Sequence, residues 1–159
     1  MNINIYCIGK IKEAYWEDAI NEYKKRLGKY VMLNIYEFKD YPTPTNSSPS
    51  IEEEIKSKEC AQFLTKIKEN TYTCALDLNN KQLDSVSFAA HLNEMLVKGK
   101  GTLNFLIGGS LGLSKEAKEK ANESITISKM TFPHQLCRVI LIEQIYRAFR
   151  ILNNEPYHK

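Results

Sequence analysis

Apolar and polar positions alternate along this chain with two different periods, and these periods predict which segments are strands and which are helices. Strands are indicated where short apolar runs alternate or are bounded by turn-forming residues. Such runs cover residues 2–8, 31–38, 71–77, 102–108 and 123–128. The third run is followed by Asn79–Asn80, where we expect a turn.

Helices are predicted between the strands, where apolar residues recur every three or four positions. The first helix has an apolar stripe that ends near Gly28. The second is expected to open with a capping box formed by Ser50 and Glu53. A third runs from about Ser85 to Val97, a short fourth is capped by Ser114, and the last runs from about His134 to Leu152.

Strands and helices therefore alternate along the whole chain. This order predicts one α/β domain, residues 1–159, with a mainly parallel sheet and helices on both faces. Only residues 39–50, which contain three prolines, interrupt the pattern, and we expect a flexible loop there. Ligands of parallel sheets bind beyond the carboxyl ends of strands, so the segments after Ala75, Ile107 and Ile127 are candidate binding loops.

Composition excludes several classes of protein. No apolar run approaches the length of about 20 residues that a membrane span needs, and the first residues lack the features of a signal peptide. The four cysteines are far apart in the sequence, and none lies at zinc-ligand spacing. Cys7 and Cys74 lie in apolar strand-like runs, so we expect buried thiols, no metal and a reducing, cytoplasmic location.

The net charge of +3 is concentrated at the C-terminal end. From residue 129 onward there are five basic and two acidic side chains, whereas the first 128 residues carry 17 of each. Three of the five basic residues are arginines, which suit bidentate binding of phosphate or carboxylate. An anionic partner near the C-terminus is one interpretation, and an ordinary solvated helix face is the other.

The stretch "LIGGSLGLSK", residues 106–115, has the strand–glycine–helix layout of a phosphate-binding loop. It matches neither the P-loop pattern nor the dinucleotide pattern, because Lys115 comes too late and Ser110 and Leu113 occupy required glycine positions. Glycine also permits a close approach of backbone to another segment or to a ligand. We therefore expect Gly108 and its neighbours to be positions of close approach.

The C-terminal helix and tail hold the remaining candidate chemistry. Arg147 and Arg150 lie three residues apart and share a helix face, while His134 at the helix start is expected to be neutral. The tail ends in Tyr157, His158 and Lys159, which offer an aromatic ring, an imidazole and a cation. This combination suits stacking on an unpaired base and contact with its phosphate, although chain ends are commonly frayed.

Several motifs resemble those of the ribosomal RNA large-subunit methyltransferase H family, small members of the SPOUT (trefoil-knot) methyltransferases. The similar stretches are "FLIGGSLGL", "ISKMTFPHQLCRVILIEQIYRAFRIL", the closing "PYHK" and "IGKIKEAYWEDAINEYKKRL" near the start. The resemblance covers nearly the whole chain and is weakest over residues 39–70. It implies a SPOUT-like fold with a C-terminal trefoil knot, a feature that hydrophobic periodicity does not reveal.

The resemblance implies that the chain uses S-adenosylmethionine to methylate N3 of a pseudouridine in 23S ribosomal RNA, on the assembled ribosome. It also implies a homodimer in which the tail of one protomer completes the pocket of the other. The glycines of the loop would then allow chain segments to thread past each other. Lys159 stands where some relatives carry arginine, so a bidentate contact is not expected there.

Site residues follow from the same resemblance. The cofactor pocket is expected from Leu76, Gly108 and the loop Ile127, Ser128, Lys129, Met130, Thr131 and Phe132. Arg147 is expected to orient the base or stabilise its developing anion, and Tyr157 with His158 to contact the target nucleotide. His158 is a candidate for the general base, whose identity the resemblance does not fix.

Two other functions stay open at this point. One is a non-catalytic RNA-binding assembly factor that keeps the fold without the cofactor, and the other is a knotted methyltransferase that acts on transfer RNA. The intact glycines and the intact "SKMTFPH" loop argue against the first.

Overall fold

The computed structural model describes all residues, 1–159, and has the α/β architecture that the alternation predicts. The strands are β1 (Asn2–Ile8), β2 (Met32–Phe38), β3 (Tyr72–Gln82), β4 (Thr102–Ile107) and β5 (Glu123–Thr126). The helices are α1 (Ala14–Leu27), α2 (Pro49–Leu64), α3 (Ser85–Lys98), α4 (Lys115–Lys120) and α5 (His134–Leu152). All strands pair in parallel, in the order β2-β1-β4-β3-β5.

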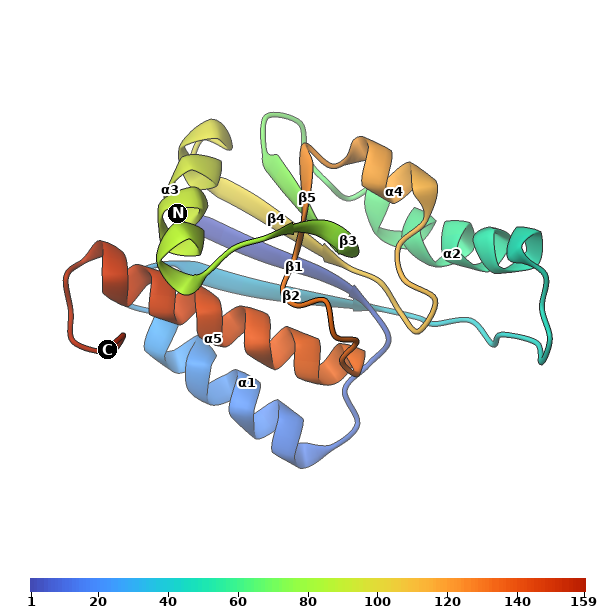
Figure 1. Cartoon of the computed structure of the whole chain (residues 1–159), viewed down its shortest axis with the longest axis horizontal. Helices are drawn as coiled ribbons and strands as arrows, with labels where there is room; N and C mark the ends of the chain where they lie inside the picture. The colour runs from blue at the N-terminus through green and yellow to red at the C-terminus, as the bar shows by residue number, and fades with distance from the viewer.

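Helices cover both faces of the sheet, as expected (Figure 1). On one face α1, α3 and α5 pack on the larger apolar cluster, to which β1 contributes Ile3, Ile5 and Cys7. On the other face α2 and α4 enclose a smaller cluster that takes Tyr6 and Ile8 from the same strand. The strand is therefore buried on both sides along its second half, which explains the continuous apolar run from Ile5 to Ile8.

Two local predictions are wrong. Ser48, and not Ser50, caps α2: its side chain accepts a hydrogen bond from the backbone N–H of Ile51, and Pro49 occupies the first helical turn. Proline is favoured at that position because its fixed φ suits the helix and no N–H is needed there. The turn expected at Asn79–Asn80 is also absent, because β3 continues to Gln82.

This longer β3 pairs with β5 in two places. Ile125 lies opposite Leu76 and also opposite Lys81, with a shift of register between them. Residues 77–80 thus lead the chain from one partner of Ile125 to the other, and the end of β3 crosses β5 in Figure 1. A crossing at this end of the sheet is compatible with the C-terminal trefoil knot that the resemblance implies.

The helix α5 connects the two ends of the molecule. It begins at the carboxyl ends of the strands and finishes near the C-terminus, on the opposite side in Figure 1. Arg147 lies 13 residues after His134 in this helix, so roughly 20 Å of helix separates the two positions. On α5, Arg138, Leu141 and Tyr146 are buried, whereas Leu136 and Ile140 are partly exposed.

Candidate functional site

A cavity of about 580 Å³ lies at the carboxyl ends of the strands, and we call it the strand-end cavity. The loops after β3, β4 and β5 form most of its wall, and α2, α4 and the start of α5 complete it. Seven of the eight residues expected to bind a cofactor line it: Leu76, Gly108, Ile127, Ser128, Met130, Thr131 and Phe132. Lys129 is not among the lining residues. The structure thus brings together the three strand-end loops singled out from the sequence.

The glycine loop forms one wall of the strand-end cavity. A Cβ atom on Gly108 would lie 2.3 Å from the carbonyl carbon of Gly112 and 2.6 Å from the backbone nitrogen of Leu113. Gly112 has φ +89°, and its N–H donates to the carbonyl oxygen of Gly109 at 3.0 Å. Close approach is therefore required at Gly108, and only glycine fits there.

Two sets of neighbours account for the close approach at these glycines. Gly108 approaches the far side of its own loop, and Gly109 lies against Ile8 of β1 and Glu59 of α2. The tight loop closed by the Gly109–Gly112 bridge therefore requires glycine at Gly108 and favours it at Gly112.

The loop between β5 and α5 is fixed by two short hydrogen bonds. The hydroxyl of Thr126 donates to the carbonyl oxygen of Ser128 at 2.8 Å, and the backbone N–H of Met130 donates to the Ser128 hydroxyl at 3.0 Å. Met130 itself is 72% exposed, although it lines the cavity. This wall combines a backbone held by hydrogen bonds with an exposed apolar side chain, a suitable surface for one face of a flat ring.

His134 lies where this loop enters α5, and it lines the strand-end cavity. Burial, with a smaller effect from the Arg138 guanidinium, lowers its pKa below the ordinary value of 6.5. It is therefore neutral at pH 7, as expected. The cause is mainly burial, whereas the sequence argument invoked the helix dipole.

Arg138 is one of the basic C-terminal residues that could bind an anionic partner, but the structure gives it another role. Its side chain is fully buried, and it donates to Glu37 Oε2 at 2.8 Å and to the carbonyl oxygens of Ile8 and Gly9 at 2.9 and 2.6 Å. An arginine with these partners joins β1, β2 and α5. It is not available to an anionic partner.

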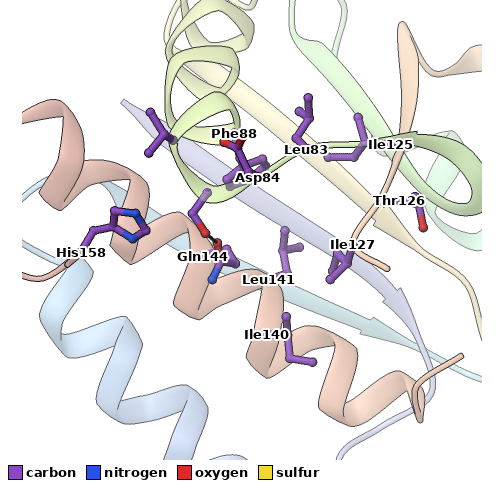
Figure 2. Close-up of a pocket in the computed structure, with 12 residues that line it drawn as sticks. Leu83, Asp84, Phe88, Ile125, Thr126, Ile127, Ile140, Leu141, Gln144 and His158 are labelled. Atoms are coloured by element: carbon purple, nitrogen blue, oxygen red, sulfur yellow. Dashed lines mark hydrogen bonds between the residues drawn. The ribbon is translucent and has the colours of Figure 1, made fainter. Parts of the chain in front are cut away.

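A second cavity of about 560 Å³, which we call the helix cavity, lies between α3, α5 and β5 (Figure 2). Its walls are mainly apolar, and its polar lining residues are Asp84, Ser85, Thr126, Gln144 and His158. In Figure 2, His158 and Thr126 lie at opposite ends of the lining residues. Thr126 and Ile127 line both cavities, so the end of β5 is their common wall.

The C-terminal tail folds back onto α5 and is not frayed. Arg150 pairs with Glu155 at 2.7 Å and donates to the Pro156 carbonyl oxygen at 3.0 Å. The ring of Tyr157 packs edge-on against Tyr146, with 4.9 Å between ring centroids. Lys159, in contrast, is exposed.

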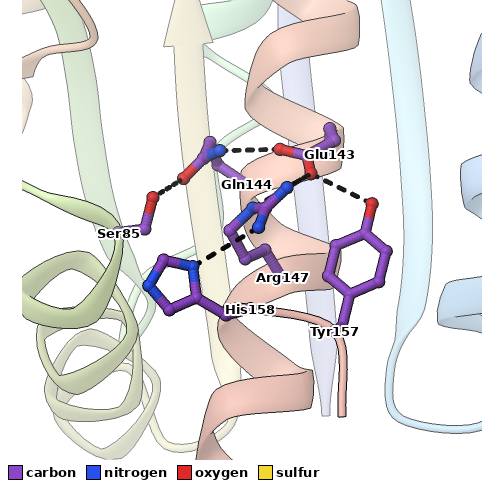
Figure 3. Close-up of polar contacts among 6 residues, drawn as sticks. All are labelled: Ser85, Glu143, Gln144, Arg147, Tyr157 and His158. Atoms are coloured by element: carbon purple, nitrogen blue, oxygen red, sulfur yellow. Dashed lines mark hydrogen bonds and ion pairs between the residues drawn. The ribbon is translucent and has the colours of Figure 1, made fainter.

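Glu143 organises a group of side chains that we call the tail cluster: Glu143, Arg147, Tyr157 and His158 (Figure 3). Its Oε1 accepts from Arg147 at 2.6 Å and from the Tyr157 hydroxyl at 3.1 Å. The Arg147 guanidinium lies over the Tyr157 ring, 4.7 Å from the centroid, and 3.4 Å from His158 Nδ1. The three residues expected to act in catalysis are therefore neighbours.

The sequence argument assigned no role to Glu143. The spacing of Glu143 and Arg147, four residues apart on one helix, is the signal that could have revealed it. It also missed Gln144, which accepts from Ser85 at 2.7 Å and donates to Glu143 at 2.6 Å. Through Gln144 the tail cluster is linked to α3.

Burial, followed by hydrogen bonding with neighbouring groups, raises the pKa of Tyr157 to about 12. The phenol is therefore protonated at neutral pH, where it can donate a hydrogen bond but cannot serve as a base. Glu143 raises the pKa of Arg147 further above its ordinary value, so the guanidinium is always cationic.

The two groups of predicted site residues are not brought together within one chain. Arg147, Tyr157 and His158 do not line the strand-end cavity, and only His158 lines the helix cavity. No group of three or more His, Cys, Asp or Glu side chains is arranged to hold a metal ion. No helix combines the length and the apolar character needed to cross a membrane.

Comparisons with known proteins agree with this geometry. A family model described as "Predicted SPOUT methyltransferase" matches residues 1–158. The chain is 54% identical to the ribosomal RNA large subunit methyltransferase H proteins of Clostridium beijerinckii and Clostridium novyi, over the full length of each. It is 52% identical to the putative ribosomal RNA large subunit methyltransferase H of Methanococcus vannielii, again over the full length of both. The chain therefore belongs to the SPOUT methyltransferases, and among them to the ribosomal RNA large subunit methyltransferase H family.

Proposed function

We propose that this single-domain protein methylates N3 of a pseudouridine in 23S ribosomal RNA, on the assembled ribosome, as a homodimer. The family assignment makes it an S-adenosylmethionine-dependent ribosomal RNA methyltransferase. The target atom, the assembled particle, the dimer and the roles of individual residues are the parts that we propose. The observation that carries the proposal is the separation of the strand-end cavity from the tail cluster.

The strand-end cavity fits S-adenosylmethionine. Its walls offer backbone groups from three loops and apolar side chains such as Leu76, Ile127 and Phe132, which suit an adenine ring. Gly108 has no side chain, and there is no space for one, so the backbone of this wall stays accessible to a ligand. When bound, this cofactor supplies a methyl group on a sulfonium centre.

The chemistry requires a nitrogen nucleophile. In the reaction, N3 of the base loses its proton, a bond forms between N3 and the methyl carbon, and the bond from that carbon to sulfur breaks. Arg147 can stabilise the negative charge on the deprotonated base. Protonated Tyr157 can donate its one hydrogen bond to that base in place of Glu143. We assign the proton of N3 to His158 as acceptor, since its ring reaches both the Arg147 guanidinium and the helix cavity. Positioning of donor and acceptor in line supplies much of the acceleration.

A homodimer would bring the two groups of residues together. Roughly 20 Å of α5 lies between His134, in the strand-end cavity, and Arg147, in the tail cluster. A tail cannot span this distance within one chain while it stays packed on Tyr146. Leu136 and Ile140 are partly exposed on α5, and a partner protomer that packs on this face would cover them. In this arrangement the tail cluster of one protomer completes the strand-end cavity of the other.

The assembled ribosome suits a protein of this size and charge. The net charge of +3 is small, and Arg138 is buried and contributes nothing to an RNA-binding surface. Weak electrostatic attraction alone supports only weak binding to free RNA. A preformed ribosomal cleft would supply shape and additional contacts, and it would place the reaction in the cytoplasm.

Methylation assays with radiolabelled cofactor test the proposal. Assembled ribosomes, isolated large subunits, free 23S RNA and transfer RNA are offered to the protein, and the product is located by mass mapping. We expect labelling of assembled ribosomes at N3 of one pseudouridine. Labelling of transfer RNA, or of 23S RNA at an atom other than N3, would contradict the proposal.

A further inference from the structure

Three charged side chains line the strand-end cavity: Lys56 from α2, Asp77 from the β3 segment and Lys118 from α4. Asp77 is the only carboxylate among the 21 lining residues. It follows Leu76 directly, at the start of the stretch that leads around β5. A single carboxylate in a mainly apolar cavity is a strong hydrogen-bond acceptor for a ligand.

Both protein contacts of the Asp77 carboxylate fall on the same oxygen. Oδ2 accepts a hydrogen bond from Asn80 Nδ2 at 2.9 Å and lies 3.6 Å from Lys118 Nζ. No protein donor reaches Oδ1. The side chain is 26% exposed, so this second oxygen belongs to a group that is held in place but not enclosed.

S-Adenosylmethionine offers few groups that a carboxylate can accept from. Its adenine is placed against Leu76 in the proposed site, and the ribose, with two vicinal hydroxyl donors, is attached directly to the adenine. The methionine carboxylate would be repelled by Asp77, and the methionine ammonium lies farther along the molecule, beyond the ribose and the sulfonium. The 6-amino group of the adenine is also a donor, but backbone carbonyl groups of the three loops around the adenine can accept from it. The hydroxyls of the ribose are then the nearest donors left to Asp77.

We propose that Asp77 binds the ribose hydroxyls of the cofactor through Oδ1, and that Lys118 and Asn80 position it by holding Oδ2. The inference rests on the proposed location of the cofactor in the strand-end cavity. It adds a specificity-determining residue that selects the ribose of the donor. In this inference Lys118 acts through Asp77, since its contact is with Oδ2 and not with the oxygen assigned to the ribose.

Calorimetric titration of the dimeric protein with S-adenosylhomocysteine and its 2′-deoxy and 3′-deoxy analogues tests this inference without RNA. We expect at least one deoxy analogue to bind the wild-type protein about 10-fold more weakly, because a hydrogen bond to a charged group is lost. The Asp77→Asn variant is expected to bind S-adenosylhomocysteine more weakly than the wild-type protein does, by a similar factor. It should bind S-adenosylhomocysteine and that deoxy analogue with equal affinity.

Lys118→Ala is expected to lower the affinity for S-adenosylhomocysteine by about 3-fold. In a protein that already carries Asp77→Asn, the same substitution should cause no further loss, because the two residues act as a unit. Lys120→Ala is the matched control, since this lysine lies on the same short helix and is exposed. Equal binding of all three ligands by the wild-type protein would overturn the inference. So would an Asp77→Asn variant that still discriminates against the deoxy analogues. A wild-type protein that binds none of the ligands would instead contradict the location of the cofactor site.

Discussion

The strand-end cavity and the tail cluster are built in different ways. Loops that connect regular elements form the cavity, and its shape depends on backbone geometry, as Gly108 and Gly112 show. The tail cluster consists of side chains on one helix and on the tail packed against it, ordered around the Glu143 carboxylate. The first arrangement suits binding of a cofactor that must be held from several sides. The second suits charge stabilisation and proton transfer, and only side chains can supply these.

The largest expected effect is on the free energy of unfolding, and it distinguishes Arg138 from Arg147. Arg138→Met removes the donors that join β1, β2 and α5, and we expect the free energy of unfolding to fall by about 3 kcal/mol. Arg147→Met removes a partly exposed ion pair and should cost less than about 1 kcal/mol. Urea denaturation followed by circular dichroism measures both. Equal losses in the two variants would show that the two arginines do not differ in role.

Removal of residues 157–159 separates the two regions functionally. We expect ribosome methylation to fall by at least about 100-fold, because the base is no longer oriented. Binding of S-adenosylmethionine and the dimeric state should not change. Calorimetry and light scattering provide these controls, and a truncated protein that methylates ribosomes at the normal rate would show that the tail has no catalytic role.

A substitution in the glycine loop should lower cofactor affinity, which removal of the tail leaves unchanged. Gly108→Val places side-chain atoms where Gly112 and Leu113 lie, so the loop must open, and we expect cofactor affinity to fall by about 10-fold to 100-fold. Dimerisation should persist. Gly28→Ala is a suitable control because Gly28 has a helical φ of −56° and lies far from the cavity in the chain. Unchanged affinity in Gly108→Val would remove this loop from the cofactor site.

The smallest expected effect is on the pH dependence of folding stability. The pKa of His134 is lowered by burial, so the unfolded chain binds more protons than the folded protein once the pH falls below 6.5. The wild-type protein should therefore lose stability as the pH falls through this range. His134→Gln should reduce this loss by less than about 1 kcal/mol, as measured by urea denaturation at pH 7 and at a series of lower values. An identical pH dependence in both proteins would contradict neutral burial of His134.

Much of the fold could be predicted from the sequence because its signals are local. Apolar runs and capping residues such as Ser114 define the elements, and their alternation is sufficient for a parallel sheet with helices on both faces. The failures lie where tertiary contacts override local preference. Asn79 and Asn80 favour a turn, yet pairing with β5 extends β3 through them.

The same division applies to the site. Strand ends converge in any parallel sheet, so the loops at Leu76, Gly108 and Ile127 could be predicted to meet. The partners of the C-terminal arginines could not be predicted in this way. Arg138 and Arg147 have the same charge and occur in the same helix, and only the packing of β1 and β2 shows that one is buried on Glu37.

Complementation between two defective protomers tests the central claim, that the tail cluster of one protomer serves the strand-end cavity of the other. A heterodimer of Gly108→Val and tail-deleted protomers, co-expressed with different tags and purified through both, contains one site in which an intact cavity meets an intact tail. We predict about half of the wild-type methylation rate per dimer, although each parent homodimer is nearly inactive. A heterodimer as inactive as its parents would contradict the claim, because cavity and tail would then have to come from the same chain.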